Sequence, residues 1–303
     1  MPDAAPLHVV SGKGGTGKTT VSLALAHVLA RTSGDTLVAE VEARHGLTEA
    51  AGRPPVPLGE ERHLLTDAHE VRVLSVDPGR ALTDYLESTL RLGLAGKVLE
   101  RTGFIDFATE LAPGLHDALL TGKLYQVCRR RAKGDPNAVA AVVLDAPPTG
   151  RIERFLTAGD ALAEVVPSGP VHAHAQTMMT LLRSATTRVH LVTTLTEMAV
   201  TETLATLDAL RRHGIAAGRV IATMVLTDVP ALPAGLDEPR LLAAHAAERA
   251  AVAAQRPWAD ALSQRLATDG LPPLVTLPFL ADDLTPTDVR RLADALQPQW
   301  VAA

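Results

Sequence analysis

The stretch that most constrains this chain is GKGGTGKT, residues 12–19, which fits the phosphate-loop pattern G-x-x-x-x-G-K-[ST]. An apolar β-branched run, Leu7–Val10, precedes it, and a helical stretch, Thr19–Ala30, follows it. A glycine-rich turn between a strand and a helix directs backbone N–H groups and the positive end of the helix dipole toward one bound anion. The sequence therefore predicts a nucleotide-binding loop, and the residues expected to contact the nucleotide are Gly12, Lys13, Gly14, Gly15, Thr16, Gly17, Lys18, Thr19 and Thr20.

Three side chains in this pattern have predictable roles. Lys18 is expected to reach the β- and γ-phosphates, and the Thr19 hydroxyl is expected to bind Mg²⁺. Asp145 ends the apolar run Ala138–Leu144, which is typical of a Walker-B carboxylate that holds Mg²⁺ through water. ATP and Mg²⁺ are accordingly the expected cofactors, with Thr19 and Asp145 on the metal side.

The distribution of apolar runs predicts the fold class. Short β-branched runs alternate with helical stretches rich in Ala and Leu, which favours an α/β fold with a doubly wound, mostly parallel sheet and helices on both faces. We expect about seven strands, at Leu7–Val10, Thr36–Val41, Val71–Val76, Ala138–Leu144, Val189–Thr194, Val220–Val225 and Leu274–Leu277. Ligands bind at the carboxyl ends of such strands, where the conspicuous polar segments of this sequence lie.

The domain organisation is expected to be simple. We predict a single domain over residues 1–303, with helical insertions at about 84–137 and 160–186. Two interpretations of these insertions stay open: ordinary helices that cover the sheet, or a surface that binds a client. A proline-rich turn after Pro230 and an alanine-rich helix, Leu241–Gln255, predict an excursion on the surface.

Composition excludes several classes of partner and site. Hydrophobic residues make up 47% of the chain and the formal net charge is −5, so no broad basic field predicts a nucleic-acid partner. Neither a signal-peptide pattern nor an apolar run of membrane-spanning length is present, which leads us to expect a cytoplasmic protein. Cys128 is the single cysteine, which excludes an internal disulfide and a zinc site built on a Cys-x-x-Cys pair within one chain.

Lys13 adds a second lysine to the phosphate loop, and with it GKGGTGKTT resembles the deviant Walker-A loop of the MinD, ParA and ArsA group. This resemblance implies a face-to-face dimer in which Lys13 reaches the nucleotide of the partner subunit. DAPPTGR (residues 145–151), VLSVDPGRALTDYL (73–86) and LPFLADDL (277–284) resemble segments of the ArsA family in the same order. The chain is most similar to the bacterial, often paired, ArsA-like ATPases.

The resemblance also assigns roles to residues outside the loop. It implies that Glu42, in EVEARHG, stands in place of the family's water-polarising aspartate, so the predicted catalytic residues are Lys13, Glu42 and Lys18. It implies that Thr223 replaces an adenine-binding asparagine and that Pro278, Phe279 and Leu280 lie near the adenine.

Three functions follow as expectations. The first is a slow Mg²⁺-dependent ATPase that works as a nucleotide-driven dimer switch, either as a homodimer or with an ArsA-like paralogue. The second is a nucleotide-binding scaffold, or regulatory partner of an active paralogue, that hydrolyses little. The third is a chaperone for hydrophobic helices, because the family includes a factor that targets membrane proteins.

Overall fold

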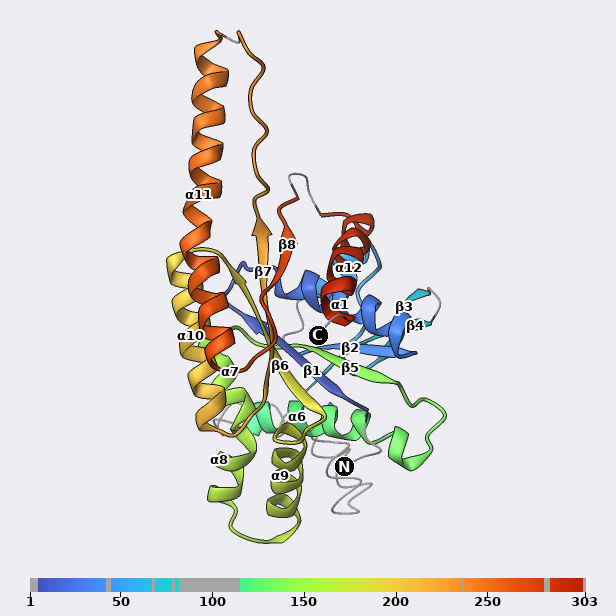
Figure 1. Ribbon diagram of the computed structural model, residues 1–303. Coiled ribbons are helices and arrows are strands. Elements are labelled where there is room, and N and C mark those ends of the chain that lie inside the picture. The colour runs from blue at the N-terminus through green and yellow to red at the C-terminus, as the bar shows by residue number, and fades with distance from the viewer. Residues whose placement is uncertain are drawn as a thin grey trace.

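One sheet organises the part of the chain that the computed structural model describes, residues 5–41, 45–66, 69–77, 80–81, 115–235, 237–280 and 284–301 (Figure 1). Its eight strands have the order β3-β4-β2-β5-β1-β6-β7-β8, and every neighbouring pair is parallel except β3 and β4. The strands are β1 (Leu7–Gly12), β2 (Thr36–Glu40), β3 (Glu61–Thr66), β4 (Glu70–Ser75), β5 (Ala141–Asp145), β6 (Thr187–Thr194), β7 (Ala217–Val225) and β8 (Val275–Pro278). The predicted α/β class with a mostly parallel sheet is confirmed.

Helices cover both faces of this sheet (Figure 1). On one face α1 (Lys18–Thr32) packs against α2 (Gly46–Ala50) and α12 (Pro286–Val301). On the other face lie α6 (Leu115–Cys128), α7 (Thr149–Leu156), α8 (Ala158–Val165), α9 (Gly169–Leu182) and α10 (Glu197–Arg212). A short 3₁₀ turn, Arg131–Lys133, follows α6. Across the described ranges, no helix has both the length and the apolar character that a membrane crossing requires.

The apolar runs are continuous because successive residues of one strand enter two different cores. Val9 belongs to the cluster formed with α6, α7, α9 and α10, whereas Val10 belongs to the cluster formed with α1 and α12. In β5, Leu144 and Val143 divide in the same way. A central parallel strand is therefore buried on both faces, and it needs apolar residues at consecutive positions rather than at alternate ones.

The sheet corrects the expected number of strands, because β3 was not predicted. Its sequence, ERHLLT, is polar in its first half, and Arg62 and His63 are exposed while Leu64 is buried. An antiparallel strand at the edge of a sheet keeps one face in solvent, so it lacks the continuous apolar run of its parallel neighbours. Pairing with β4, which includes a register shift between His63 and Leu65, determines this strand.

The predicted helical insertions are described in part. In the segment 84–137, α6 accounts for residues 115–128, and residues 84–114 lie outside the described ranges. In the segment 160–186 the structure has the end of α8 and the whole of α9.

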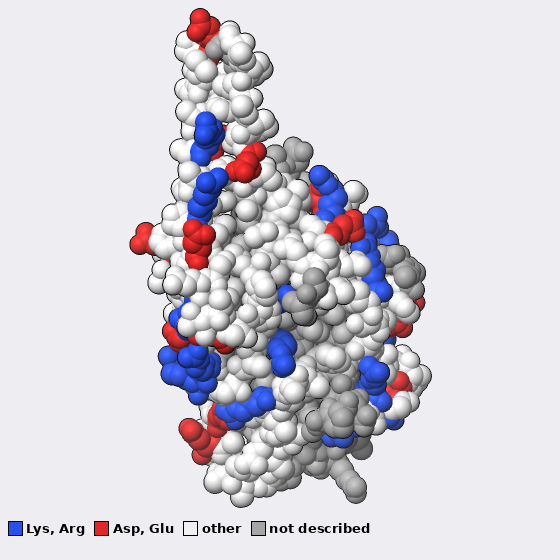
Figure 2. All heavy atoms as spheres, viewed as in Figure 1, with Lys and Arg blue, Asp and Glu red and all other residues white. Residues whose placement is uncertain are grey.

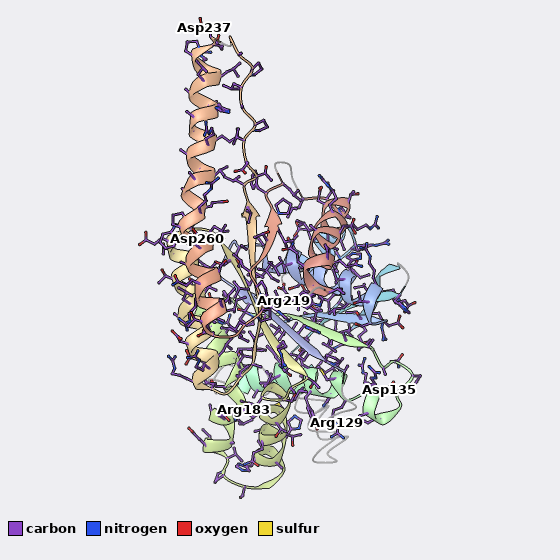
Figure 3. The ribbon with its side chains drawn as sticks, viewed as in Figure 1. Arg129, Asp135, Arg183, Arg219, Asp237 and Asp260 are labelled. Atoms are coloured by element: carbon purple, nitrogen blue, oxygen red, sulfur yellow. The ribbon has the colours of Figure 1, made fainter. Side chains whose placement is uncertain are left out.

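The surface excursion is larger than predicted and forms an arm (Figure 1). Its helix α11 runs from Pro239 to Thr268, well beyond the predicted Leu241–Gln255, and its buried residues are Leu262 and Leu266, both in the last turns. Figure 3 labels Asp237 at the tip, and Figure 2 shows acidic side chains at the tip and both basic and acidic side chains along the lower half of the arm. Gln255 fastens its base, because the amide accepts from the Leu226 N–H (3.0 Å) and donates to the Met224 carbonyl (3.3 Å). Alanine has the highest helix propensity, which explains how a helix with so little packing forms.

His8 of β1 and His190 of β6 form a histidine pair on neighbouring strands. Both lie in the N-terminal half of their strand, away from the phosphate loop. The Arg219 N–H donates to Nδ1 of His190 (3.0 Å), so Nε2 of the neutral His190 ring carries the proton and donates to Nδ1 of His8 (3.1 Å). Trp300 of α12 packs against His190, with ring centroids 4.9 Å apart. Burial, followed by the charge of Arg188, lowers the pKa of His8 to about 4, and burial holds the pKa of His190 well below its ordinary value. Both rings are therefore neutral near pH 7.

This pair predicts a loss of stability in mild acid. A histidine in the unfolded chain takes up a proton below about pH 6.5, whereas His8 in the folded protein does so only near pH 4. The contribution of His8 to the stability of the folded state is therefore complete above pH 6.5, and it is lost as the pH falls toward 4. The free energy of unfolding, measured with urea, should fall by up to about 3 kcal/mol from this group over that interval. His8→Asn keeps an acceptor for His190 but does not titrate, so its unfolding free energy should depend less on pH. Parallel pH profiles for the two proteins would contradict this account.

Candidate functional site

The loop between β1 and α1 is held against the sheet at Gly12. A β-carbon at this position would lie 2.0 Å from the carbonyl oxygen of Val192 on β6, so only glycine lets the end of β1 come this close. Gly15 and Gly17 have φ angles of 85° and 81°, in the left-handed region where glycine has no steric penalty. Gly17 precedes α1 directly, so the loop ends at the positive end of the helix dipole.

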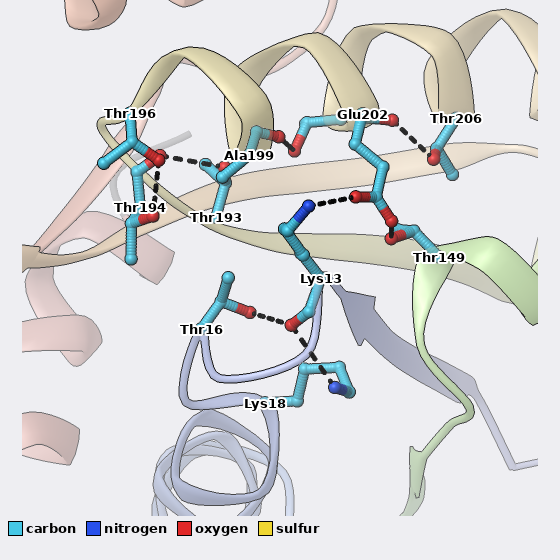
Figure 4. Close-up of polar contacts among 11 residues, drawn as sticks. Lys13, Thr16, Lys18, Thr149, Thr193, Thr194, Thr196, Ala199, Glu202 and Thr206 are labelled. Carbon is cyan, nitrogen blue, oxygen red and sulfur yellow. Dashed lines mark hydrogen bonds and ion pairs between the residues drawn. The ribbon is translucent and has the colours of Figure 1, made fainter.

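One backbone carbonyl organises the interior of the loop. The carbonyl oxygen of Lys13 accepts from the Thr16 hydroxyl (2.8 Å) and N–H (3.3 Å), and Nζ of Lys18 lies 3.5 Å from it (Figure 4). The buried Thr223 hydroxyl lies 2.8 Å from the carbonyl oxygen of Thr16 and 3.2 Å from that of Thr193. Thr223 thus joins the loop to β6 and β7, a contact that sequence reasoning did not anticipate.

The predicted metal-side residues lie together at the start of α1. The Thr19 hydroxyl donates to Oδ2 of Asp145 (2.7 Å) and the Ser22 hydroxyl donates to Oδ1 (3.1 Å). Burial raises the pKa of Asp145 to about 6; the two hydroxyl bonds and the charge of Lys18 oppose this shift, and the charge of Glu40 adds to it. A hydroxyl and a carboxylate side by side form an oxygen donor set of the kind that Mg²⁺ prefers, so these residues fit the predicted ion.

Glu40 is a further acidic residue at this place, and sequence reasoning missed it. It ends β2 directly beside Asp145 in the register of β2 and β5, and it is only 4% exposed. Among the described residues its Oε1 has no hydrogen-bond partner, and Nδ1 of His45 lies 3.7 Å away. The signal that could have found it is an acidic residue as the last member of a buried strand next to a phosphate loop. Glu42, the predicted catalytic residue, lies outside the described residues.

Lys13 points away from Lys18 and toward α10 (Figure 4). Its Nζ lies 3.2 Å from Oε2 of Glu202, and both side chains are about a third exposed, at 34% and 32%. The other carboxylate oxygen of Glu202 accepts from the hydroxyl of Thr149, the first residue of α7. Glu202 therefore connects the phosphate loop with the segment after β5. Sequence reasoning did not identify this residue.

The ends of β7 and β8 lie side by side, in the place predicted for the adenine. Val225 pairs with Pro278, and the Phe279 N–H donates to the Val225 carbonyl (2.9 Å). Met224 has a φ of 54°, unusual for a residue other than glycine, at the register shift of this pair. Phe279 and Met224 are large apolar side chains that stay exposed, at 50% and 41%. Exposed apolar surface here is suited to a flat base, and Leu280, half-buried, continues it.

A groove of about 1140 Å³ lies elsewhere, between α8 and α9. Its lining includes Asp160, Glu164, Arg183 and His213, and Arg183 pairs with Asp160 at 2.7 Å. None of the predicted site residues lines it.

Comparison with known proteins places this geometry in a family. A family model described as anion-transporting ATPase matches residues 7–169, more than half of the chain, including the loop, Asp145 and Thr149. ATPase BagA of Mycobacterium tuberculosis is 41% identical over 216 residues, which are 71% of this chain and 64% of that protein. ATPase GET3 of Kluyveromyces lactis is 26% identical over 183 residues, 58% of this chain and 52% of that protein. ATPase GET3 of Eremothecium gossypii is 28% identical over 164 residues, 52% and 46% of the respective chains.

The matched part therefore spans less than two thirds of the length of each of these relatives. The family model covers more than half of the chain and contains the phosphate loop with its two lysines. The chain belongs to the anion-transporting ATPase family.

Proposed function

We propose that this protein is a Mg²⁺-dependent ATPase whose subunits close face to face around ATP and separate after hydrolysis. The observation that carries the proposal is that the two lysines of one loop point in different directions. Lys18 lies over the loop interior, whereas Lys13 leaves the loop and pairs with Glu202 (Figure 4). Because the Lys13 side chain points out of its own phosphate loop, it could act on a nucleotide that a second subunit presents.

The loop residues would bind and orient the nucleotide. Lys18 and the N–H groups at the start of α1 would neutralise the β- and γ-phosphates, and Thr19 and Asp145 would hold Mg²⁺. When bound, the ion supplies positive charge that stabilises the phosphate oxygens during transfer. Met224 and Phe279 would flank the adenine. The Thr223 hydroxyl has a single proton and two carbonyl neighbours, so it could offer only a lone pair to the base.

Lys13 would change partners as the dimer closes. Its pair with Glu202 is partly solvated, and such pairs contribute about 1 kcal/mol or less, so a phosphate presented across the interface can compete for the ammonium group. Closure would exclude water and strengthen that second contact, which stabilises charge on the transferred phosphoryl group. Once Lys13 has left, Glu202 would be able to move, and a movement that breaks its bond to Thr149 would leave that hydroxyl able to respond to the γ-phosphate.

Glu42 is proposed to position the attacking water. If Glu42 does not do so, the alternative is that the protein is a scaffold that binds nucleotide without hydrolysing it. The partner is a second copy of this chain or a related ATPase. A client among hydrophobic helices stays a proposal drawn from relatives named GET3.

Lys18→Ala should abolish ATP binding, because it removes the cation that faces the β- and γ-phosphates and leaves the glycine backbone in place. Isothermal titration with ATP and Mg²⁺ measures this. Lys133→Ala, an exposed lysine of the 3₁₀ turn, is the matched control and should bind as the wild type does. Unchanged affinity in Lys18→Ala would refute the phosphate-binding role of the loop.

Glu42→Gln should bind ATP normally and hydrolyse it far more slowly, because an amide cannot polarise water as a carboxylate does. Wild-type turnover should itself be slow, about one per minute or less, as in switch NTPases before activation. Phosphate release measures both. If the wild type releases no more phosphate than Lys18→Ala, the scaffold alternative is correct. Glu42→Asp should be faster than the wild type if the longer side chain limits the reaction.

Lys13→Ala should leave ATP binding to one subunit nearly intact, but weaken ATP-induced dimerisation and suppress hydrolysis. The decisive experiment mixes Lys13→Ala with Lys18→Ala subunits and measures phosphate release. The Lys18→Ala chain cannot bind ATP, yet it offers an intact Lys13 to the other subunit, so the mixture should regain part of the activity that each variant lacks. Mixed dimers without any recovery would show that Lys13 acts within its own subunit.

A further inference from the structure

Two acidic side chains end neighbouring strands beside the start of α1. Glu40 on β2 and Asp145 on β5 are directly opposite in register, and the negative charge of Glu40 acts on the Asp145 carboxyl group. Both belong to the face of the sheet that α1 covers, because Val38 and Val143, two residues earlier on each strand, pack in the cluster formed with α1. The two carboxylates therefore face the same small region as Thr19.

The two carboxylates differ in how their oxygens are used. Each oxygen of Asp145 accepts a hydroxyl hydrogen bond, from Thr19 and from Ser22. Oε1 of Glu40 is buried and accepts no hydrogen bond from the part of the chain that the structure describes, and Nδ1 of His45, at 3.7 Å, is beyond hydrogen-bond distance. A buried carboxylate oxygen without a donor is unfavourable, and two neighbouring carboxylates that are largely shielded from water repel each other. Such an arrangement is expected where a cation, or the water around it, completes the site.

We propose that Glu40 is a second carboxylate of the magnesium site and that it accepts hydrogen bonds from the water bound to the ion. The inference rests on the proposed function, since it takes Mg²⁺ to bind with nucleotide beside Thr19. Mg²⁺ keeps several of its water molecules when it binds to proteins, so carboxylates around it commonly act through water. Asp145 and Glu40 would then hold the hydrated ion from two adjacent strands.

Calorimetric titration of Mg²⁺ into protein saturated with ADP tests this role. Glu40→Gln should weaken Mg²⁺ binding by about 10- to 100-fold, as expected for a group that orients the ligands of a metal, and Asp145→Asn should weaken it comparably. Glu49→Gln is the matched control, because Glu49 is an exposed glutamate on nearby α2, and it should bind Mg²⁺ as the wild type does.

The thermal unfolding temperature of the nucleotide-free protein is a second readout. It should change in one direction if Glu40 serves the ion and in the opposite direction if Glu40 only supports the fold. Glu40→Gln removes one of two neighbouring negative charges, so its unfolding temperature should rise above that of the wild type although its Mg²⁺ affinity falls. A lower unfolding temperature with unchanged Mg²⁺ affinity would show that Glu40 only supports the fold. If Glu40→Gln does not fold, Glu40→Asp withdraws the carboxylate by one methylene without removing its charge, and wild-type affinity in that variant would overturn the proposal.

The two acidic residues separate this inference from the proposed function. If Asp145→Asn loses Mg²⁺ affinity and Glu40→Gln does not, the role of Glu40 is overturned and the magnesium site at Asp145 stands. If neither substitution changes the affinity, the ion does not bind there, and both proposals fall.

Discussion

The close approach of the phosphate loop to β6 at Gly12 is the contact on which the rest of the site depends. Because no side chain separates Gly12 from the Val192 carbonyl, the end of β1 continues straight into the loop. The loop therefore lies close to the sheet, at the carboxyl ends of its strands. That position brings the Thr16 carbonyl within reach of the Thr223 hydroxyl. The carbonyl of Lys13 is thereby oriented toward Thr16 and Lys18. Contacts with two strands, β6 and β7, thus hold the glycine-rich segment as an ordered cradle.

Charge is arranged in two groups around this cradle. Beneath the start of α1, Asp145 and Glu40 form an acidic pair, and of the two only Asp145 accepts hydroxyl hydrogen bonds from the described residues. At the outer side, Lys13 and Glu202 form a partly solvated pair that also involves Thr149. A cation stabilises neighbouring like charges, whereas a solvated pair exchanges partners easily. The first group is suited to holding an ion and the second to a change of partners.

Prediction from the sequence succeeded where a local pattern carries the information. The seven apolar runs correspond to seven of the eight strands of the described sheet; six of these are central strands, which need apolar residues on both faces, and β8 is a parallel edge strand. β3 was not predicted because its stability comes from pairing with β4 at the sheet edge. The full length of α11 was not predicted because an alanine-rich sequence favours helix but does not indicate where the helix begins or ends. Thr19 and Asp145 were predicted to lie on the metal side of the site; in the structure they are hydrogen-bonded to each other, and their binding of Mg²⁺ stays a prediction.

The sequence by itself indicated the phosphate loop, the α/β class and the placement of Thr19 and Asp145 at one end of the sheet, because each follows from short-range spacing or from the rule that ligands bind at strand ends. Tertiary structure alone decided the partners of Lys13 and Thr223 and the environment of Glu40. Lys13 and Glu202 are 189 residues apart, and Thr223 and Thr16 are 207 apart, so no local pattern relates them. Glu40 looks like an ordinary charge at the end of a strand until the neighbouring strand places Asp145 beside it. Contacts of this kind depend on which strands become neighbours, and that is a property of the whole folded chain.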